Sequence, residues 1–421
     1  MQWLKEIPSH WEIIPLKRCL NTPLMYGANE APDGEDLSLP RYIRITDIDE
    51  QGKLKSSTYK SLSREKAAPY MLQKGDLLFA RSGATVGKSY IFEETIEACF
   101  AGYLIKAHCT DKLLPKFLFR YTQSDIYDLW KNSIFIQSTI PNISAEKYST
   151  LPIPFPPLAE QEKIVSYLES KTSKIDAYVA DKENEIQLLQ ELKQKTIAEA
   201  VTKGLNPDVK IKDSGISWLG MIPEHWGTKR IASLFTGKVK ANTDFEYHHA
   251  FKFYYGTLVP KEETGDIEEY RDTYVKYSVL QKNDIMINGL NLNYDFISQR
   301  VAISPSDGII TSAYVVARPR KGTNAQYYNY LFKTMDNMKL FHGMGTGIRL
   351  TLSFDELKKQ LVVVPPADEQ QAIVSYIEEK CQKIDTLITD LQAEIDYLKE
   401  YKQRLIADVV TGQVNVQNET I

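Results

Sequence analysis

The sequence has no apolar run near the ~20 residues that a membrane-spanning helix needs. Its first residues, MQWLKEIP, also lack the basic start and the apolar stretch of a secretory signal peptide. We therefore expect a cytoplasmic protein without a membrane anchor. Its 43% apolar and 25% charged residues are ordinary for a soluble globular protein. At roughly 150 residues per domain, 421 residues allow two or three domains.

Cysteine is scarce, and the four present form no CxxC pair. The six histidines include no HExxH pattern. A structural zinc site needs paired thiolate or imidazole ligands at short spacing, so we expect neither a metal site nor a disulfide framework. Isolated cysteines are typical of small buried apolar side chains. They are Cys19, Cys99, Cys109 and Cys381.

Catalytic signatures are missing as well. The sequence has no Asn/Asp-Pro-Pro-aromatic motif, which adenine methyltransferases use to hold the exocyclic amine, and no convincing glycine fingerprint for S-adenosylmethionine. No Ser/His/Asp arrangement stands out either. We therefore assign no catalytic, cofactor-binding or metal-binding residue.

What the sequence does contain is a long internal repeat. WLKEIPSHW (3–11) and WLGMIPEHW (218–226) share six of nine letters. PPLAEQEKIVSYLE (156–169) returns as PPADEQQAIVSYIE (365–378), and KQKTIAEAVT (193–202) returns as KQRLIADVVT (402–411). QKGDLLF (73–79) has a counterpart in QKNDIMI (281–287). Nearly constant offsets over such a distance indicate a tandem duplication.

The repeated segments at 158–203 and 367–412 are predicted to form long helices. Each follows Pro-Pro, begins with acidic residues, and has no further Pro or Gly until Gly204 or Gly412. Mostly apolar residues recur with a seven-residue period in each segment and form a stripe along the helix, called the seam below. The seam runs from Val165 to Thr196 in the first segment and from Val374 to Leu405 in the second. Four heptads predict a coiled coil, and ~45 residues at ~1.5 Å each predict rods of ~65 Å.

The duplication also predicts how the helices pair. Two similar modules, each followed by a similar helix, pack most simply about a pseudo-twofold axis, which makes the helices antiparallel and places the modules at opposite ends. Short β-rich runs and short helical stretches such as 115–132 predict an α+β fold for each module. The expected domains are 1–155 (first module), 156–204 (first helix), 205–226 (linker and lead-in), 227–364 (second module), 365–412 (second helix) and 413–421 (tail).

Charge is segregated along the chain, although the total is only −4. Lys and Arg outnumber Asp and Glu by 19 to 18 in residues 1–152 and by 18 to 14 in residues 229–364. The acid lies in the helices, with 7 basic against 9 acidic residues in 158–203 and 5 against 10 in 365–412. A DNA-binding face needs local positive charge, so the total does not exclude nucleic acid.

Two variable modules alternating with two helices that open with Pro-Pro-x-x-Glu-Gln resemble the specificity subunit of type I restriction–modification systems. PFPPLAEQEKIVSYLE, VPPADEQQAIVSYIE, WLGMIPEHW and GDLLFARSGATVGK carry the resemblance, which covers essentially the whole chain. It implies a non-catalytic subunit in which each module is a target-recognition domain for one half of a two-part sequence in double-stranded DNA.

The resemblance also implies partners. The helices would set the separation of the modules and dock methyltransferase subunits, with restriction subunits joining for cleavage. S-adenosylmethionine and ATP are then expected on those partners and not on this chain. The Glu-Gln pairs at the helix starts, Glu160 with Gln161 and Glu369 with Gln370, are the expected partner-binding residues. The Trp-Leu…Ile-Pro…His-Trp lead-ins are expected to pack on the helix pair as apolar anchors.

The loop GATVGKS (83–89) is the first candidate DNA contact. It has three residues between its glycines where a phosphate loop has four, and the β-like SYIF follows where a helix is required. A tight loop facing DNA, or a plain solvated turn, fits better. Arg can read guanine through a bidentate pair. The candidate residues are Arg81, Ser82, Gly83, Thr85 and Lys88.

The matching loop of the second module, INGLNLNYDFISQR (287–300), differs in its letters, as expected of modules that read different bases. Asn288, Asn291 and Asn293 suit adenine edges, although asparagine also populates turns. FHGMGTGIRL (341–350) predicts either a hinge or a loop that contacts the DNA backbone through Thr346 and Arg349. The alternation in HHAFKFYY (248–255) favours a strand whose aromatic residues pack in the core.

Two other functions remain open at this point. GATVGKS allows a phosphate-loop NTPase with a coiled-coil arm. Net acidity allows a coiled-coil scaffold that joins two protein partners without DNA.

Overall fold

The computed structural model describes residues 7–49, 52–83, 85–135, 141–297, 299–348 and 350–417. The chain divides into two compact units, Met1–Glu183 with Gln392–Ile421, and Asn184–Leu391. Each unit contains one globular module and one half of each long helix. Among the helices described, none has both the length and the apolar character of a membrane span.

The first unit is built on a four-stranded sheet of order β2-β7-β4-β5, accompanied by the pairs β1-β8 and β3-β6. Its strands are β1 (Glu12–Pro15), β2 (Met25–Tyr26), β3 (Arg41–Ile43), β4 (Leu77–Ala80), β5 (Ser89–Ile91), β6 (Ala98–Phe100), β7 (Leu104–Ala107) and β8 (Pro152–Phe155). Its short helices are α1 (Arg64–Ala67), α2 (Pro115–Tyr121), α3 (Asp125–Phe135) and α4 (Ala145–Ser149).

The second unit has a four-stranded sheet of order β12-β19-β16-β17 and four strand pairs, β9-β10, β11-β20, β13-β14 and β15-β18. Its strands are β9 (Ile211–Asp213), β10 (Met221–Pro223), β11 (Gly227–Arg230), β12 (Phe235–Thr236), β13 (Phe251–Tyr254), β14 (Thr257–Pro260), β15 (Ser278–Leu280), β16 (Ile285–Ile287), β17 (Val301–Ile303), β18 (Gly308–Ile310), β19 (Val315–Pro319) and β20 (Leu361–Val364). Its short helices are α6 (Ile231–Leu234), α7 (Arg271–Tyr274), α8 (Ala325–Asn337) and α9 (Phe354–Leu357).

The two modules share one framework, which confirms the internal duplication. Their four-stranded sheets have equivalent orders. The repeated QKGD and QKND turns each bury an aspartate ahead of a central strand. The carboxylate of Asp76 accepts a hydrogen bond from Gln73 N, and its Oδ1 lies 2.7 Å from His108 Nδ1. Asp284 accepts from Gln281 N and pairs with Arg318 Nη2 at 2.7 Å.

The helical stretch expected at 115–132 is two helices, α2 and α3, because Ser124 interrupts it. The Ser124 hydroxyl donates to Tyr121 O and accepts from Tyr127 N, which ends one helix and starts the next. One of the short β-rich runs that predicted strands is YIRITDI (42–48). Only Tyr42 and Ile43 of this run belong to β3, because Ile45–Asp47 form a 3₁₀ turn. Three of the four cysteines are buried, and burial raises the pKa of Cys19 to about 11 and of Cys99 and Cys109 to about 12.

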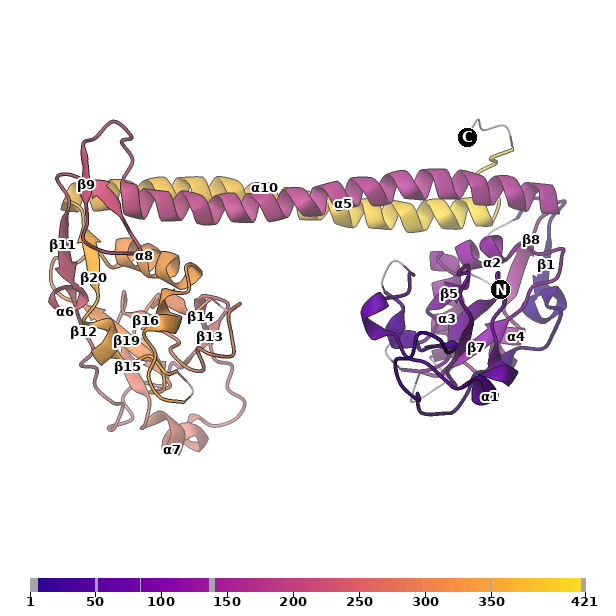
Figure 1. Cartoon of the computed structure of the whole chain (residues 1–421), viewed down its shortest axis with the longest axis horizontal. Helices are drawn as coiled ribbons and strands as arrows, with labels where there is room; N and C mark the ends of the chain where they lie inside the picture. The colour runs from indigo at the N-terminus through magenta and orange to yellow at the C-terminus, as the bar shows by residue number, and fades with distance from the viewer. Residues whose placement is uncertain are drawn as a thin grey trace. The chain divides into compact units, whose positions relative to one another are not determined.

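The expected long helices are α5 (Leu158–Lys203) and α10 (Ala367–Val410), and within each unit they lie side by side (Figure 1). Every position of both predicted seams is buried or half-buried. In the first unit, contacts from Asp176 and Glu183 of α5 reach Lys402 and Lys399 of α10, so the helices are antiparallel. The coiled coil predicted from the heptads is therefore confirmed.

The three lysines that interrupt the seams pair with carboxylates of the opposite helix. Lys193 Nζ lies 2.6 Å from Asp385 Oδ1, and Lys402 Nζ lies 2.6 Å from Asp176 Oδ1. Lys182 Nζ lies 3.4 Å from Glu394 Oε2. Each lysine therefore keeps its charged end at the edge of the seam, where its stem can cover apolar surface.

Each lead-in packs where the long helices start and end. Trp11 is 7% exposed and lies against Gly412, and a Cβ on that glycine would fall 2.5 Å from Pro8 Cδ. Trp226 is fully buried against Gly204, where a Cβ would fall 3.1 Å from Trp226 Cζ2. Both glycines have positive φ, +74° and +78°, and end their helices as left-handed caps. The described parts of the lead-ins are thus apolar anchors, as predicted, while residues 3–6 of the first lead-in lie outside the described residues.

Candidate nucleic-acid interface

The loop from Arg81 to Lys88 connects β4 to β5 and closes on itself. Gly87 N donates to Ala80 O at 2.9 Å, Val86 N to Gly83 O at 3.1 Å, and Lys88 N to Thr85 O at 3.0 Å. These N–H groups are therefore not turned outward as a phosphate cradle. Strand β5 follows the loop in place of a helix. The phosphate-loop alternative is not favoured.

Lys88 is held by the backbone of a neighbouring segment. Its Nζ donates to Ile48 O at 3.3 Å and to Asp49 O at 2.5 Å. A lysine that binds phosphate needs its ammonium directed at the ligand, whereas this ammonium ties two loops together. Thr85 and Gly83 are exposed on the same turn, and Gly83 has open space around it.

Arg81 is positioned by main-chain and ring contacts. Its N–H donates to Tyr103 O at 3.0 Å, and its carbonyl accepts from Ile143 N at 2.8 Å. The guanidinium lies over the ring of Tyr26, with Cζ 4.8 Å from the centroid. Tyr26 is fixed in turn, because its hydroxyl accepts from Ala145 N. An arginine stacked this way is held in one orientation, which suits reading a base edge.

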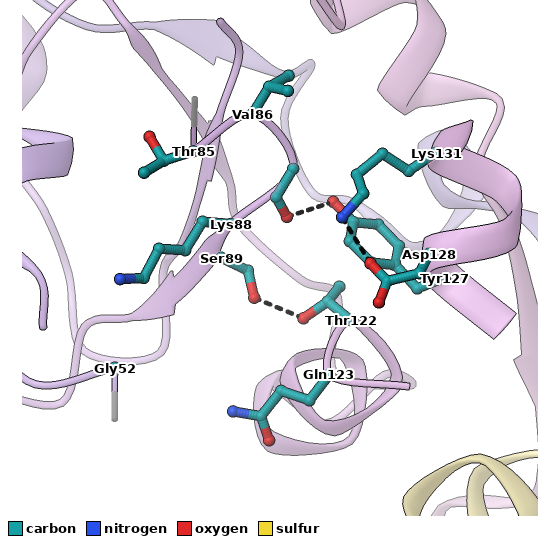
Figure 2. A pocket seen from close by; sticks show the side chains of 11 residues that line it. Gly52, Thr85, Val86, Lys88, Ser89, Thr122, Gln123, Tyr127, Asp128 and Lys131 are labelled. Atoms are coloured by element: carbon teal, nitrogen blue, oxygen red, sulfur yellow. Dashed lines mark hydrogen bonds and ion pairs between the residues drawn. The ribbon is translucent and has the colours of Figure 1, made fainter. Parts of the chain in front are cut away.

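A depression of about 320 Å³ opens beside this loop (Figure 2). Tyr127 donates to Gly87 O at 2.8 Å, and burial raises the pKa of this tyrosine well above its usual range. Lys131 Nζ forms an ion pair with Asp128 Oδ1 at 2.5 Å. The side chain of Lys131 also passes close to Gly87, because a Cβ atom added to this glycine would lie only 2.2 Å from Lys131 Cδ. Figure 2 shows Lys88 directed away from Lys131, so the two ammonium groups do not converge on one point.

In the second module, the three candidate asparagines have different surroundings. Asn288 Oδ1 accepts from Leu290 N at 3.2 Å and shapes the turn after β16. Asn293 Nδ2 donates to Ile348 O at 3.3 Å. Asn291 is exposed and has a left-handed backbone, with φ +51°. Of the three, Asn291 is the one presented to solvent.

The sequence interpretation missed Arg300, which holds this loop from beneath. Arg300 is 1% exposed and donates to three carbonyls, Asn288 O, Leu290 O and Asp295 O, at 3.0, 2.8 and 2.7 Å. Its own N–H donates to Asp336 Oδ2 at 2.7 Å. Nothing in the sequence separates this arginine from a surface one, since the hydrogen bonds of its guanidinium go to main-chain carbonyls whose positions only the fold decides.

The structure brings two predicted sites of the second module together. Leu352 N donates to Gly289 O at 2.9 Å, and Leu292 N donates to Leu350 O at 3.2 Å. Thr346 is exposed in the second of these loops, where it pairs with Thr351 through two main-chain bonds. Arg349 lies outside the described residues. The asparagine loop and the glycine-rich loop therefore form one continuous surface.

The predicted partner-binding residues are engaged within the chain. Glu160 accepts from Trp11 Nε1 at 3.0 Å and contacts His10 Nε2 at 2.8 Å. Gln161 is buried, accepts from Leu114 N, and donates to Lys112 O and Pro156 O.

The second copy repeats the arrangement. Glu369 accepts from Trp226 Nε1 at 3.0 Å and contacts His225 Nε2 at 2.8 Å. Gln370 is buried and donates to Pro365 O at 2.8 Å. In both copies the glutamate joins the lead-in to the first turn of a long helix, and docking of a partner at these residues stays a prediction.

Comparison with known proteins points to one family. A family model described as the type I restriction modification DNA specificity domain matches twice, over residues 14–188 and 223–397. The specificity subunit of the type I restriction enzyme EcoKI from Escherichia coli K12 is 21% identical over 358 residues, 81% of this chain and 75% of that protein. The EcoBI specificity subunit from Escherichia coli is 23% identical over 424 residues, 92% of this chain and 82% of that protein.

Solved structures show the same fold. The HsdS subunit from Thermoanaerobacter tengcongensis superimposes with a TM-score of 0.53 and 16% identity, covering 97% of this chain and 99% of that one. A chain from work on complex assembly and conformational transition of the type I R-M system gives a TM-score of 0.71 and 16% identity, covering 97% of this chain and 100% of that one.

Proposed function

We propose that this chain, which belongs to the type I restriction modification DNA specificity family, recognises the DNA target of a type I restriction–modification complex. Each module reads one half of a two-part target. The observation that carries the proposal is the second copy of the family domain, with a sheet of equivalent order and a different loop at the equivalent place.

The contrast between framework and loops explains why two copies are useful. The buried aspartate and the central strand after it are common to both modules. The segments that follow differ in length and chemistry, ARSGATVGK in the first and NGLNLNYDFISQR in the second. Sequence is read by side chains that reach base edges, so different loops on one framework give different half-sites.

The proposed interface uses the candidate residues that the structure leaves on the surface. In the first module these are Arg81, stacked on Tyr26, and the exposed Thr85. In the second they are Asn291 and Thr346. Gly83 is exposed on the same turn as Thr85 but has no side chain. Ser82 forms a backbone bridge with Asn142. The remaining candidates shape or brace the two loops through hydrogen bonds; they are Lys88, Asn288 and Asn293. Arg349 is kept as a proposed backbone contact on sequence grounds alone.

The long helices are proposed to set the distance between half-sites and to dock methyltransferase subunits. Helix α5 is continuous over 46 residues, which at ~1.5 Å per residue is ~69 Å of rod. The proposed partners supply the chemistry, with S-adenosylmethionine on the methyltransferase and ATP on the restriction subunits. The chain itself is proposed to be non-catalytic.

The test is to purify the chain with its methyltransferase subunits and to map the methylated sites on genomic DNA. We expect methylation at one two-part sequence. Methylation without sequence preference would overturn the proposal. Exchanging residues 227–364 for the corresponding module of another family member should change one half-site only, whereas a scaffold without a DNA role predicts no change.

A further inference from the structure

The pair β13-β14 is a two-stranded ribbon with an unusual turn. Tyr254 pairs with Thr257, which leaves Tyr255 and Gly256 as the two turn residues. Both have positive φ, +43° and +74°. Turns of this kind normally carry Asn-Gly or Asp-Gly, because a bulky residue in the left-handed region is strained. A tyrosine at this position is unfavourable for the turn itself.

One face of the ribbon packs on the module and the other faces solvent. Phe251 and Leu258 are buried in a cluster with Met286 of β16, and Phe253 packs against this cluster. Strand β14 contacts β17, and β13 contacts β18. On the opposite face, Lys252, Tyr254 and Thr257 are exposed. Side chains alternate between the faces of a strand, so this division follows from the register. The core packing expected for HHAFKFYY therefore holds for Phe251 and fails for the tyrosines.

The exposed tyrosines are next to the asparagine loop. Tyr254 and Tyr255 are 57% and 73% exposed, with their rings edge to face at 4.6 Å. A Cβ on Gly256 would fall 2.4 Å from Gln299 Oε1, so the tip of the ribbon abuts the end of that loop. Tyr294, within the same loop, is 76% exposed. The tip of the ribbon and the loop beside it therefore both expose large aromatic side chains that the fold does not bury.

We propose that the β13-β14 ribbon is a reading element for the second half-site, with Tyr254 and Tyr255 contacting bases in a groove of double-stranded DNA. This inference rests on the proposed function. A major groove about 12 Å wide admits a two-stranded ribbon. Tyrosine presents an apolar ring with a hydroxyl that both donates and accepts, and Lys252 on the same face supplies positive charge for phosphate.

The charges around the ribbon favour DNA approaching at its tip. The acidic segment 262–272 follows β14 directly and so lies at the other end of the ribbon. Two of its carboxylates have partners within the module, Glu263 with Tyr274 and Glu268 with Arg271. Among the strands described in the first module, no pair is joined by a two-residue turn. Within the described residues, a ribbon of this kind is therefore found in the second module and not in the first.

The test uses Tyr255→Asn in the full chain assembled with methyltransferase subunits. Asparagine tolerates positive φ and restores the common Asn-Gly turn, so this variant removes the ring without weakening the ribbon. Binding is measured by fluorescence anisotropy on three duplexes: the mapped target, the target altered in its first half, and the target altered in its second half. The control is Ile211→Asn, which removes a side chain 60% exposed on β9.

We expect Tyr255→Asn to weaken binding to the intact target by roughly 10-fold, which corresponds to the loss of about one base contact. The variant should lose discrimination against the altered second half and keep it against the altered first half. Wild-type binding by the variant overturns the inference, and so does an equal loss on all three duplexes. Failure to assemble with the methyltransferase would assign the tyrosines to a protein contact instead. If the wild-type complex itself shows no preference, the proposed function fails.

Discussion

Lys193 Nζ lies 2.6 Å from Asp385 Oδ1, across the seam between the two long helices. In the internal repeat, Lys402 corresponds to Lys193 and Asp176 corresponds to Asp385. These two residues make the same contact at the same distance. The duplication thus placed a lysine in each seam and an acceptor for it in the opposite helix. The repeat is visible in the letters, whereas the reciprocity appears only when the helices are paired.

These ion pairs are partly exposed, so their contribution to stability should be small. We expect Lys193→Ala to lower the free energy of unfolding by less than about 1 kcal/mol, as for exposed ion pairs in general. A double-mutant cycle with Asp385→Ala, followed by urea unfolding, measures the coupling. The cycle for Lys402 and Asp176 serves as a matched copy. Coupling near zero at both sites would mean that the lysines act only by covering the seam.

The tryptophan of each lead-in should stabilise its helix start through one hydrogen bond. Trp226→Phe keeps most of the apolar volume but removes the donor to Glu369. We expect the free energy of unfolding to fall by about 1.5–3 kcal/mol, as is typical of the loss of a hydrogen bond to a charged acceptor. Thermal or urea unfolding checks this, and Trp11→Phe removes the same bond to Glu160. Unchanged stability in both variants would contradict the role of the glutamate as a tether.

The contact between the two loops of the second module depends on Gly289. A Cβ there would fall 2.6 Å from Leu352 O, a main-chain atom that cannot rotate away. We expect Gly289→Ala to cost about 1–3 kcal/mol by overpacking. Gly343→Ala is the control, because nothing lies within 4 Å of its Cβ position. Equal unfolding midpoints for the two variants would show that the loops do not meet as described.

The stability of the second module should depend on the titration of Asp336. Burial raises the pKa of this carboxyl, while a hydrogen bond from Arg300 N acts in the opposite direction. The folded protein then holds a proton that the unfolded chain releases above a pKa of about 3.9. Stability therefore falls as the pH rises through this region.

Asp336→Asn removes that dependence. The stability of the wild type relative to this variant should be greatest below the pKa of an ordinary aspartate, about 3.9, and should decline as the pH rises toward neutral. Urea unfolding at a series of pH values measures the difference. A wild type that gains relative stability as the pH rises would show that the carboxylate is favoured in the folded state.

Arg81 is expected to act in base recognition only when Tyr26 holds it. Arg81→Lys removes the planar fork and its stack, and should cost about 1–3 kcal/mol of discrimination in the first half-site. Methylation of duplexes with single substitutions in that half-site provides the measurement. Tyr26→Phe keeps the ring under the guanidinium but removes the hydrogen bond from Ala145 N that fixes this ring, so it should cost less discrimination than Arg81→Lys. Equal effects of both variants would assign the role to the Tyr26 hydroxyl.

Much of the fold was predictable because its signals are periodic. The heptad seams from Val165 and from Val374 predicted two long helices, and all their positions are buried or half-buried in the structure. The repeated QKGD and QKND showed which places in the two modules correspond. The first candidate loop was found by its glycines and the second by its place after QKND, but the contacts of neither loop were predicted. Lys88, chosen as a DNA contact, donates to Ile48 O and Asp49 O.

The sequence by itself determined the duplication, the long helices and the family, since repeats and seven-residue spacing are properties of the chain read in order. The tertiary structure decided which side chains brace loops and which face solvent. Arg300 is buried beneath three carbonyls, while Tyr255 stands exposed on a strained turn. Neither outcome is local, because each depends on atoms that folding brings from elsewhere in the chain.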